Sequence, residues 1–167
     1  MSEAKYGEEF ITHEFDEAIA IQQAIVDGAE TLTTVHSRAD SKRLIKTVLK
    51  EDQKFLKELR RLGKKHDATG KAEGVALALK ELMDETAQSA AEAPSESYEA
   101  HAVLINLKRK QQDSAAAMLK IAREQKDTEL RDAATEFGKA TKASAQELAD
   151  DLALFAVEIA TMQPARV

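Results

Sequence analysis

The sequence of 167 residues contains no cysteine and few of the residues that interrupt helices. Without cysteine the chain has no disulfide scaffold, thiolate zinc site, iron–sulfur cluster or cysteine nucleophile. Only two prolines and six glycines occur, while alanine, glutamate, lysine, leucine and glutamine are abundant, as is typical of helical proteins. We therefore expect an all-α protein.

Long apolar runs and common enzyme motifs are also missing. No stretch approaches the roughly 20 apolar residues that cross a bilayer, and the first residues, Met-Ser-Glu-Ala-Lys, contain no apolar signal segment. A glycine-rich phosphate loop, Gly-x-Ser-x-Gly and His-Glu-x-x-His are absent from the sequence. We expect a cytoplasmic protein without a membrane span, and no motif indicates an enzyme.

Apolar residues recur at helical spacing in five segments, and residues that cap or break helices separate these segments. The predicted long helices cover residues 8–36, 41–66, 96–126 and 128–161, and a shorter one covers 72–91. Residues 37–41 are predicted to carry a turn and the N-cap of the helix that follows, and Ser95 is predicted to cap the next long helix. The buried face of the short helix is predicted to hold Val75, Leu79, Leu82 and Thr86. The chain length suits a single domain, residues 1–167.

The connections between these segments differ in length. Short turns join the first long helix to the second and the third to the fourth, which predicts two antiparallel hairpins. The connection between the hairpins is long enough to return along the bundle, and it contains the short helix. These features predict a four-helix bundle with one long crossover, as in ferritin-like folds. A plain bundle with a disordered connection is the alternative.

Polar residues interrupt each predicted apolar stripe near the middle of its helix. Helix centres in hairpins lie at similar heights, so these side chains are expected to form one polar layer. An unpaired buried polar group costs about 1–3 kcal/mol, so such a layer should be hydrogen-bonded internally or hold water or a ligand. We expect Lys108 to pair with Asp52 there. The candidate layer comprises Gln22, Asp52, Lys108, Gln112 (with Gln111 as the alternative at that position), Thr141 and Ser144.

Two segments carry a likeness to a known family. They are Leu-Lys-Glu-Asp-Gln-Lys-Phe-Leu-Lys-Glu-Leu at residues 49–59 and Thr-Lys-Ala-Ser-Ala-Gln-Glu-Leu at residues 141–148. With them the chain resembles the ferritin-like superfamily in its rubrerythrin-like branch. The resemblance implies a ferritin-like helical bundle, and it places the family's di-iron site at the centre of that bundle.

The di-iron motif of this family is degenerate in the chain. Members of the family place a Glu and a His three residues apart just before a Leu, and a Glu in the first helix. The resemblance assigns these positions to Asp52 with Phe55, Thr141 with Ser144, and Ile25. No Glu-x-x-His occurs, because the residues three before the four histidines are Phe10, Thr33, Gly63 and Tyr98.

The remaining donors form a poor metal site. Asp52 with the amides of Gln22 and Gln112 would supply one carboxylate and amide oxygens, whereas transition metals prefer imidazole or thiolate ligands. We therefore expect no cofactor, and iron or manganese is the alternative. In a one-crossover bundle, His13 and His66 should lie near one end. The other end should hold His36 and His101.

Charge is unevenly distributed along the chain, whose net charge is −6. Residues 42–65 contain ten basic and three acidic side chains, whereas residues 8–36 contain acidic side chains and no Lys or Arg. Mutual attraction between the two helices of a hairpin is one explanation. A strip for nucleic acid or anionic lipid is another. The acidic overall balance and the lack of interleaved aromatics argue against a nucleic-acid partner.

These observations predict a non-catalytic ferritin-like helical bundle that works as an interaction or stress-associated protein. Alanine-rich faces such as Ala115–Ala117 allow close helix approach, so we expect self-association or a protein partner. One alternative is a divergent ferritin-like metal-binding protein or oxidoreductase with an atypical site. The other is a nucleic-acid-binding bundle that uses the basic helix.

Overall fold

The computed structural model describes residues 3–164, which form five α-helices and one short 3-10 helix. No strand occurs in this range, and the all-α prediction is confirmed. The elements are α1 (Gly7–Val35), α2 (Ala39–Gly63), η1 (Lys64–His66), α3 (Gly74–Ser89), α4 (Pro94–Gln125) and α5 (Thr128–Thr161).

Local chemistry explains where the later helices begin. Pro94 occupies the first turn of α4, where its missing N–H has no intrahelical partner to lose and its φ is already helical. Asp127 caps α5, since its carboxylate accepts a hydrogen bond of 3.0 Å from the backbone N–H of Leu130.

The N-cap position of α2 is Arg38, within residues 37–41 as predicted, and Ser41 does not cap the helix. The helix begins at Ala39, and Ser41 lies fully buried in its first turn. Its hydroxyl donates to the carboxylate of Asp151 on α5 at 2.6 Å instead. The same carboxylate pairs with Arg38, so this cluster ties the start of α2 to α5. Ser95 lies inside α4, whose N-cap position is Ala93, so the predicted capping role of Ser95 is wrong.

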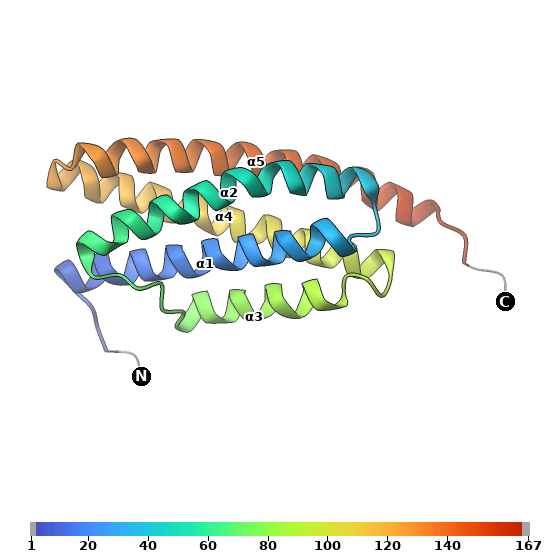
Figure 1. Ribbon diagram of the computed structural model, residues 1–167, viewed down its shortest axis with the longest axis horizontal. Helices are drawn as coiled ribbons and strands as arrows, with labels where there is room; N and C mark the ends of the chain where they lie inside the picture. Colours follow the sequence, from blue (N-terminus) through green and yellow to red (C-terminus); the bar gives the residue numbers. More distant parts are fainter. Residues whose placement is uncertain (1–2, 165–167) are drawn as a thin grey trace.

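The long helices form two hairpins, α1 with α2 and α4 with α5 (Figure 1). α3 runs back alongside the bundle, from the end where α2 finishes to the end where α4 begins, and packs on α1 and α4. α1 also neighbours α4, and α2 neighbours α5, so α2 and α4 lie at opposite corners of the bundle. Both termini of the described chain lie at the ends of this elongated shape.

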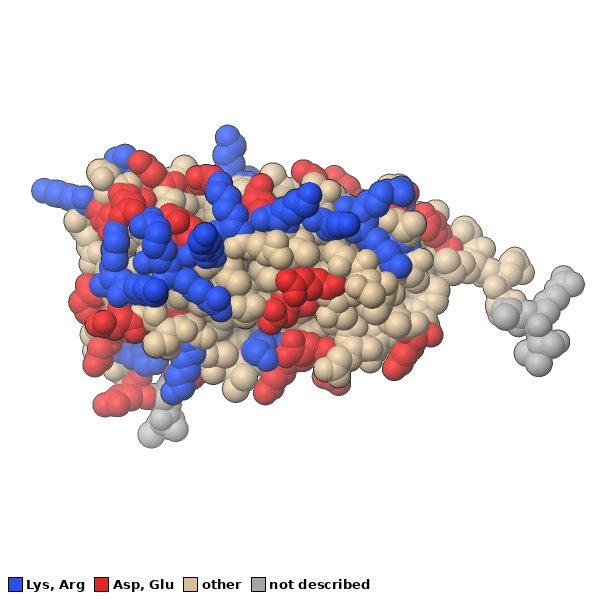
Figure 2. Space-filling view, viewed as in Figure 1, with Lys and Arg blue, Asp and Glu red and all other residues tan. Residues whose placement is uncertain are grey.

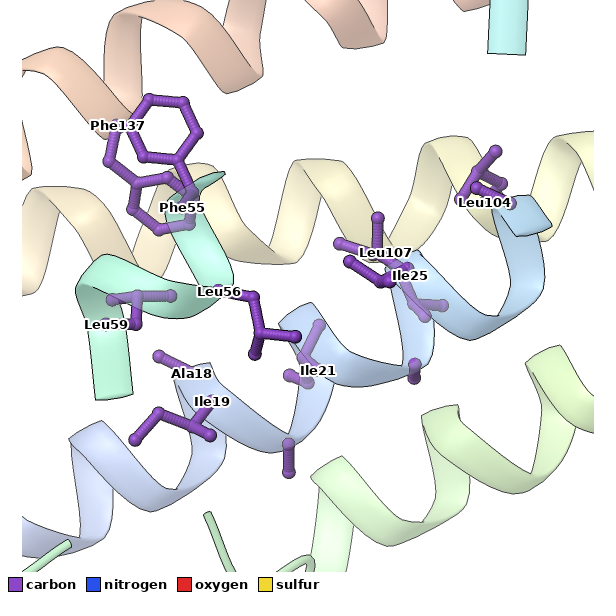
Figure 3. Close-up of a cluster of buried hydrophobic side chains, with 14 of the residues drawn as sticks. Ala18, Ile19, Ile21, Ile25, Phe55, Leu56, Leu59, Leu104, Leu107 and Phe137 are labelled. Atoms are coloured by element: carbon purple, nitrogen blue, oxygen red, sulfur yellow. The ribbon is translucent and has the colours of Figure 1, made fainter. Parts of the chain in front are cut away.

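Leucine, isoleucine and phenylalanine side chains fill the space between the hairpins. Phe55 packs against Phe137 with ring centroids 5.1 Å apart, and Leu107 of α4 and Ile25 of α1 belong to the same buried cluster (Figure 3). Ile25 is fully buried. These contacts hold α1, α2, α4 and α5 around one core.

The buried face of α3 differs from the predicted one. Val75 and Leu82 are 59% and 43% exposed, whereas Ala76 and Met83 are buried. The reason is close helix approach, because a Cβ built on Gly28 of α1 would lie 2.7 Å from Cγ of Met83. Small side chains and one flexible methionine fit this contact, and the larger aliphatic residues face outward.

Candidate functional site

Four buried polar side chains meet near mid-height of the bundle. Gln22 comes from α1, Asp52 from α2, and Lys108 and Gln111 from α4. Each lies near the middle of its helix and is at most 3% exposed. Together they are called the central polar layer below.

Lys108 and Asp52 form the ion pair predicted from the sequence. Nζ of Lys108 donates to Oδ1 and Oδ2 of Asp52 at 2.6 and 2.8 Å. Since α2 and α4 occupy opposite corners, this pair bridges the diagonal of the bundle. A buried ammonium and a buried carboxylate each lose hydration, and their mutual contact offsets part of that loss.

The two glutamines complete the central polar layer. Nε2 of Gln22 donates to the backbone oxygen of Asp52 at 3.0 Å and lies 3.4 Å from its Oδ1. Nε2 of Gln111 donates to Oε1 of Gln22 at 3.0 Å and to the backbone oxygen of Ala18 at 2.9 Å. The hydrogen bonds therefore run from α4 through α1 to α2, and the ion pair closes the circuit back to α4.

Gln112 does not belong to this layer, so its assignment is corrected to Gln111. Gln111 is fully buried, and Gln112 is half-buried. The inward face of α4 follows the spacing Leu104, Leu107, Gln111, Ser114 and Met118, all of which are buried. This three-and-four alternation excludes residue 112 from the buried face.

The two α5 candidates stand apart from the central polar layer. Thr141 is buried, but its hydroxyl forms no hydrogen bond within residues 3–164. Ser144 is half-buried, donates to the backbone oxygen of Thr141 at 3.2 Å, and lines a groove between α2 and α5. The structure thus unites Gln22, Asp52 and Lys108 from the predicted layer and leaves Thr141 and Ser144 outside the hydrogen-bonded group.

In the central polar layer, the opposite charges of Lys108 and Asp52 balance each other. Burial raises the pKa of the Asp52 carboxyl, and the Lys108 ammonium and the Gln22 amide oppose that rise. Both carboxylate oxygens already accept hydrogen bonds from the ammonium, and among residues 3–164 no other carboxylate is buried in the layer. In the described chain, no three His, Asp or Glu side chains are grouped so that they could hold a metal ion. The donor set does not fit the di-iron centre that the resemblance implies.

A second buried polar group lies at the end of the bundle where α1 finishes. The N–H of Arg38 donates to Nδ1 of His36 at 3.0 Å, which leaves the proton of a neutral His36 ring on Nε2. That nitrogen lies 3.2 Å from Nδ1 of His101, and Nε2 of His101 lies 3.0 Å from the oxygen of Leu148. Each of these three hydrogen bonds has one donor and one acceptor only when both imidazoles are neutral.

The same environment lowers the pKa of both histidines. Burial, reinforced by neighbouring His101, lowers the pKa of His36 to about 4. Burial also lowers the pKa of His101, and its hydrogen bond to Leu148 opposes that shift. His36 and His101 therefore share one end of the bundle, as predicted, and serve there as neutral hydrogen-bonding groups.

The opposite end holds the other two histidines. The ring of His66 stacks on Phe15 with centroids 5.1 Å apart, and its backbone oxygen accepts from the hydroxyl of Thr12 at 2.6 Å. His13, the residue after Thr12, lies 3.2 Å from Nζ of Lys5. His66 and His13 therefore contribute packing and hydrogen bonds to this end of the bundle.

No helix in residues 3–164 is long and apolar enough to cross a membrane. Comparison with models of known protein families and with curated proteins finds no match for the chain. Its function is therefore inferred from its own geometry.

Proposed function

We propose that the chain is a metal-independent, ferritin-like helical bundle that acts as an interaction protein and not as an enzyme. The observation that carries the proposal is the ion pair at the centre. The Lys108 ammonium supplies, from within the chain, the positive charge that metal ions supply in di-iron bundles.

The path of the chain supports the ferritin-like part of the proposal. Ferritin-like folds join two antiparallel hairpins by one long crossover. In this chain α3 makes the return between the α1–α2 and α4–α5 hairpins (Figure 1).

The family's ligand positions hold side chains with other roles. Ile25 is fully buried among aliphatic residues, and Phe55 packs against Phe137. Asp52 is paired with Lys108. The hydrogen bonds and the ion pair of this centre fix the mutual positions of α1, α2 and α4 and offer no open coordination position. The proposal therefore places the binding function on the surface of the molecule.

Metal analysis of protein purified without chelator tests the metal-independent part. We expect iron and manganese far below one ion per chain, and a melting temperature that neither chelator nor added Fe²⁺ or Mn²⁺ changes. A stoichiometric iron or manganese content that disappears in Asp52→Asn would overturn the proposal and favour a divergent metal protein.

Self-association is the second part of the proposal. Leu154 and Val157, one turn apart on α5, are 60% and 63% exposed, and the last turns of α5 extend beyond the other helices (Figure 1). Exposed neighbouring aliphatic residues of this kind favour an apolar contact with a second copy. Light scattering at increasing protein concentration should show a dimer that Leu154→Ser with Val157→Ser converts to monomer. A wild-type chain that stays monomeric would remove this part.

A further inference from the structure

A row of cations follows the outward face of α2 and ends at the first residue of η1; it is called the α2 stripe below. It consists of Lys46, Lys50, Lys57, Arg60 and Lys64, all exposed. Their spacing of three, four or seven residues places them on one side of the helix. From Lys46 to Lys64 the row extends about 27 Å at 1.5 Å per residue. Figure 2 shows basic side chains following α2 along the molecule.

The neighbouring acidic helix does not neutralise the α2 stripe. Within residues 3–164 none of its five members forms an ion pair, and no ion pair joins α1 to α2. Other cations of α2 do pair, as Lys54 does with Glu136 and Arg61 with Glu129 on α5. Direct pairing within the first hairpin therefore does not account for the basic composition of this helix.

The chemistry of the α2 stripe favours phosphate groups over a protein surface. Its members are four lysines and one arginine, and the large exposed apolar side chains lie on other parts of the described chain. Protein interfaces are depleted in lysine and centre on apolar and aromatic anchors. Single-stranded nucleic acids are bound through aromatic stacking, and the stripe has no aromatic member. Duplex phosphates need only the charges.

Because the α2 stripe is narrow, it suits a rod-shaped nucleic-acid duplex better than a flat membrane surface. Glu30 on α1 and Glu136 on α5 border the α2 helix, where they contact Gln53 and Lys54. A flat anionic membrane brought onto α2 would also meet these two carboxylates. A duplex lying along the helix meets the cations over about eight base pairs, given 3.4 Å per base pair.

We propose that the α2 stripe binds the phosphate backbone of double-stranded nucleic acid without reading its sequence. The inference rests on the proposed function, according to which the bundle binds partners through its surface. It also departs from the sequence-based expectation, which relied on overall charge and on the lack of interleaved aromatics. The five cations form no ion pair within residues 3–164, and duplex phosphates need no aromatic stacking.

Fluorescence anisotropy of a labelled 24-base-pair DNA duplex of mixed sequence tests the inference with the full chain. Binding should be measurable at about 50 mM salt and weaken towards about 200 mM. A plot of the logarithm of the association constant against the logarithm of the salt concentration should fall with a slope no steeper than about −4.5, the value for five phosphate contacts. Lys50→Glu with Lys57→Glu and Lys64→Glu should weaken binding at least about tenfold at the lower salt.

A matched control variant makes the same change in net charge on another helix. Arg109, Lys120 and Arg123 are exposed on α4 and form no ion pair in the described range. Changing all three to Glu should alter duplex affinity by no more than about twofold. Circular dichroism checks that both variants keep the helical content of the wild type.

Three results would overturn the inference: no duplex binding at the lower salt, equal loss in both triple variants, or tighter binding to phosphatidylserine vesicles or single-stranded DNA than to the duplex. The proposed function fails separately, through the metal content of the purified chain. A metal-free chain that ignores the duplex removes only the inference about the α2 stripe.

Discussion

Lys108 and Asp52 neutralise each other across the diagonal of the bundle, with the ammonium at 2.6 and 2.8 Å from the two carboxylate oxygens. Lys108→Met leaves the carboxylate buried without its counter-ion, so the free energy of unfolding should fall by about 3–5 kcal/mol. Adding Asp52→Leu removes the orphaned charge and should recover much of that loss. Urea titrations of the single and double variants measure the coupling. If the double variant loses the sum of both single losses, the pair does not act as a unit.

The buried histidine pair predicts a loss of stability in mild acid. Because the pKa of His36 falls from 6.5 to about 4 on folding, the unfolded state binds more protons between these values. The contribution of His36 to the free energy of unfolding should therefore be fully present above about pH 6.5. It should decline towards about pH 4 by up to about 1.4 kcal/mol per pH unit for this group.

Chemical denaturation at several pH values across this interval measures the decline. In His36→Asn with His101→Gln, both titratable rings are replaced by amides, so the free energy of unfolding should change less with pH than in the wild type. An unchanged pH dependence in the double variant would assign the effect to other groups.

The close contact between α1 and α3 predicts that a side chain at Gly28 forces Met83 to move. A Cβ there would meet Met83 at 2.7 Å from Cγ and 2.9 Å from Sδ. Overpacking of this kind costs about 1–3 kcal/mol, against a gain in helix propensity of about 1 kcal/mol for glycine to alanine. We expect Gly28→Ala to lower the melting temperature, and Met83→Ala should cost less in that background than in the wild type. A Gly28→Ala chain that melts higher would contradict the packing.

The cluster of Arg38, Ser41 and Asp151 predicts unequal effects for two small substitutions. Asp151→Ala removes partners of both Arg38 and the buried Ser41 hydroxyl, so the free energy of unfolding should fall by about 1–3 kcal/mol. Ser41→Ala leaves the ion pair intact and should cost about 1 kcal/mol or less. Equal losses, measured by urea titration, would show that the hydroxyl and not the ion pair dominates.

Helix positions were largely predictable because residues that break helices are few and clear. The five α-helices lie within three residues of the predicted ranges, with Pro94 and Asp127 marking two of the starts. Which side of a helix is buried was less predictable. Periodicity could not decide between Gln111 and Gln112, which are adjacent and chemically identical, and only the packing of α4 selects the first.

Contacts between distant segments explain the remaining differences. Ser41 belongs to a segment rich in capping residues, and only the fold brings Asp151, 110 residues away, to its hydroxyl. The exposed side of α3 could not be predicted either, because the close approach of Gly28 to Met83 decides it. Lys108 and Asp52 could be paired from the sequence because each interrupts an apolar stripe at mid-helix with opposite charge.

α1 lies against α2, α3 and α4, whereas α3 buries only Ala76, Met83 and Ala87 of its sixteen residues. Backbone amides exchange with solvent through the least stable opening that exposes them. Because so little of the crossover helix is buried, we expect it to separate from the bundle before either hairpin unfolds and its amides to take up deuterium early. The middle of α1 remains enclosed by the other hairpin until the whole domain opens, which makes it the segment that retains protons longest.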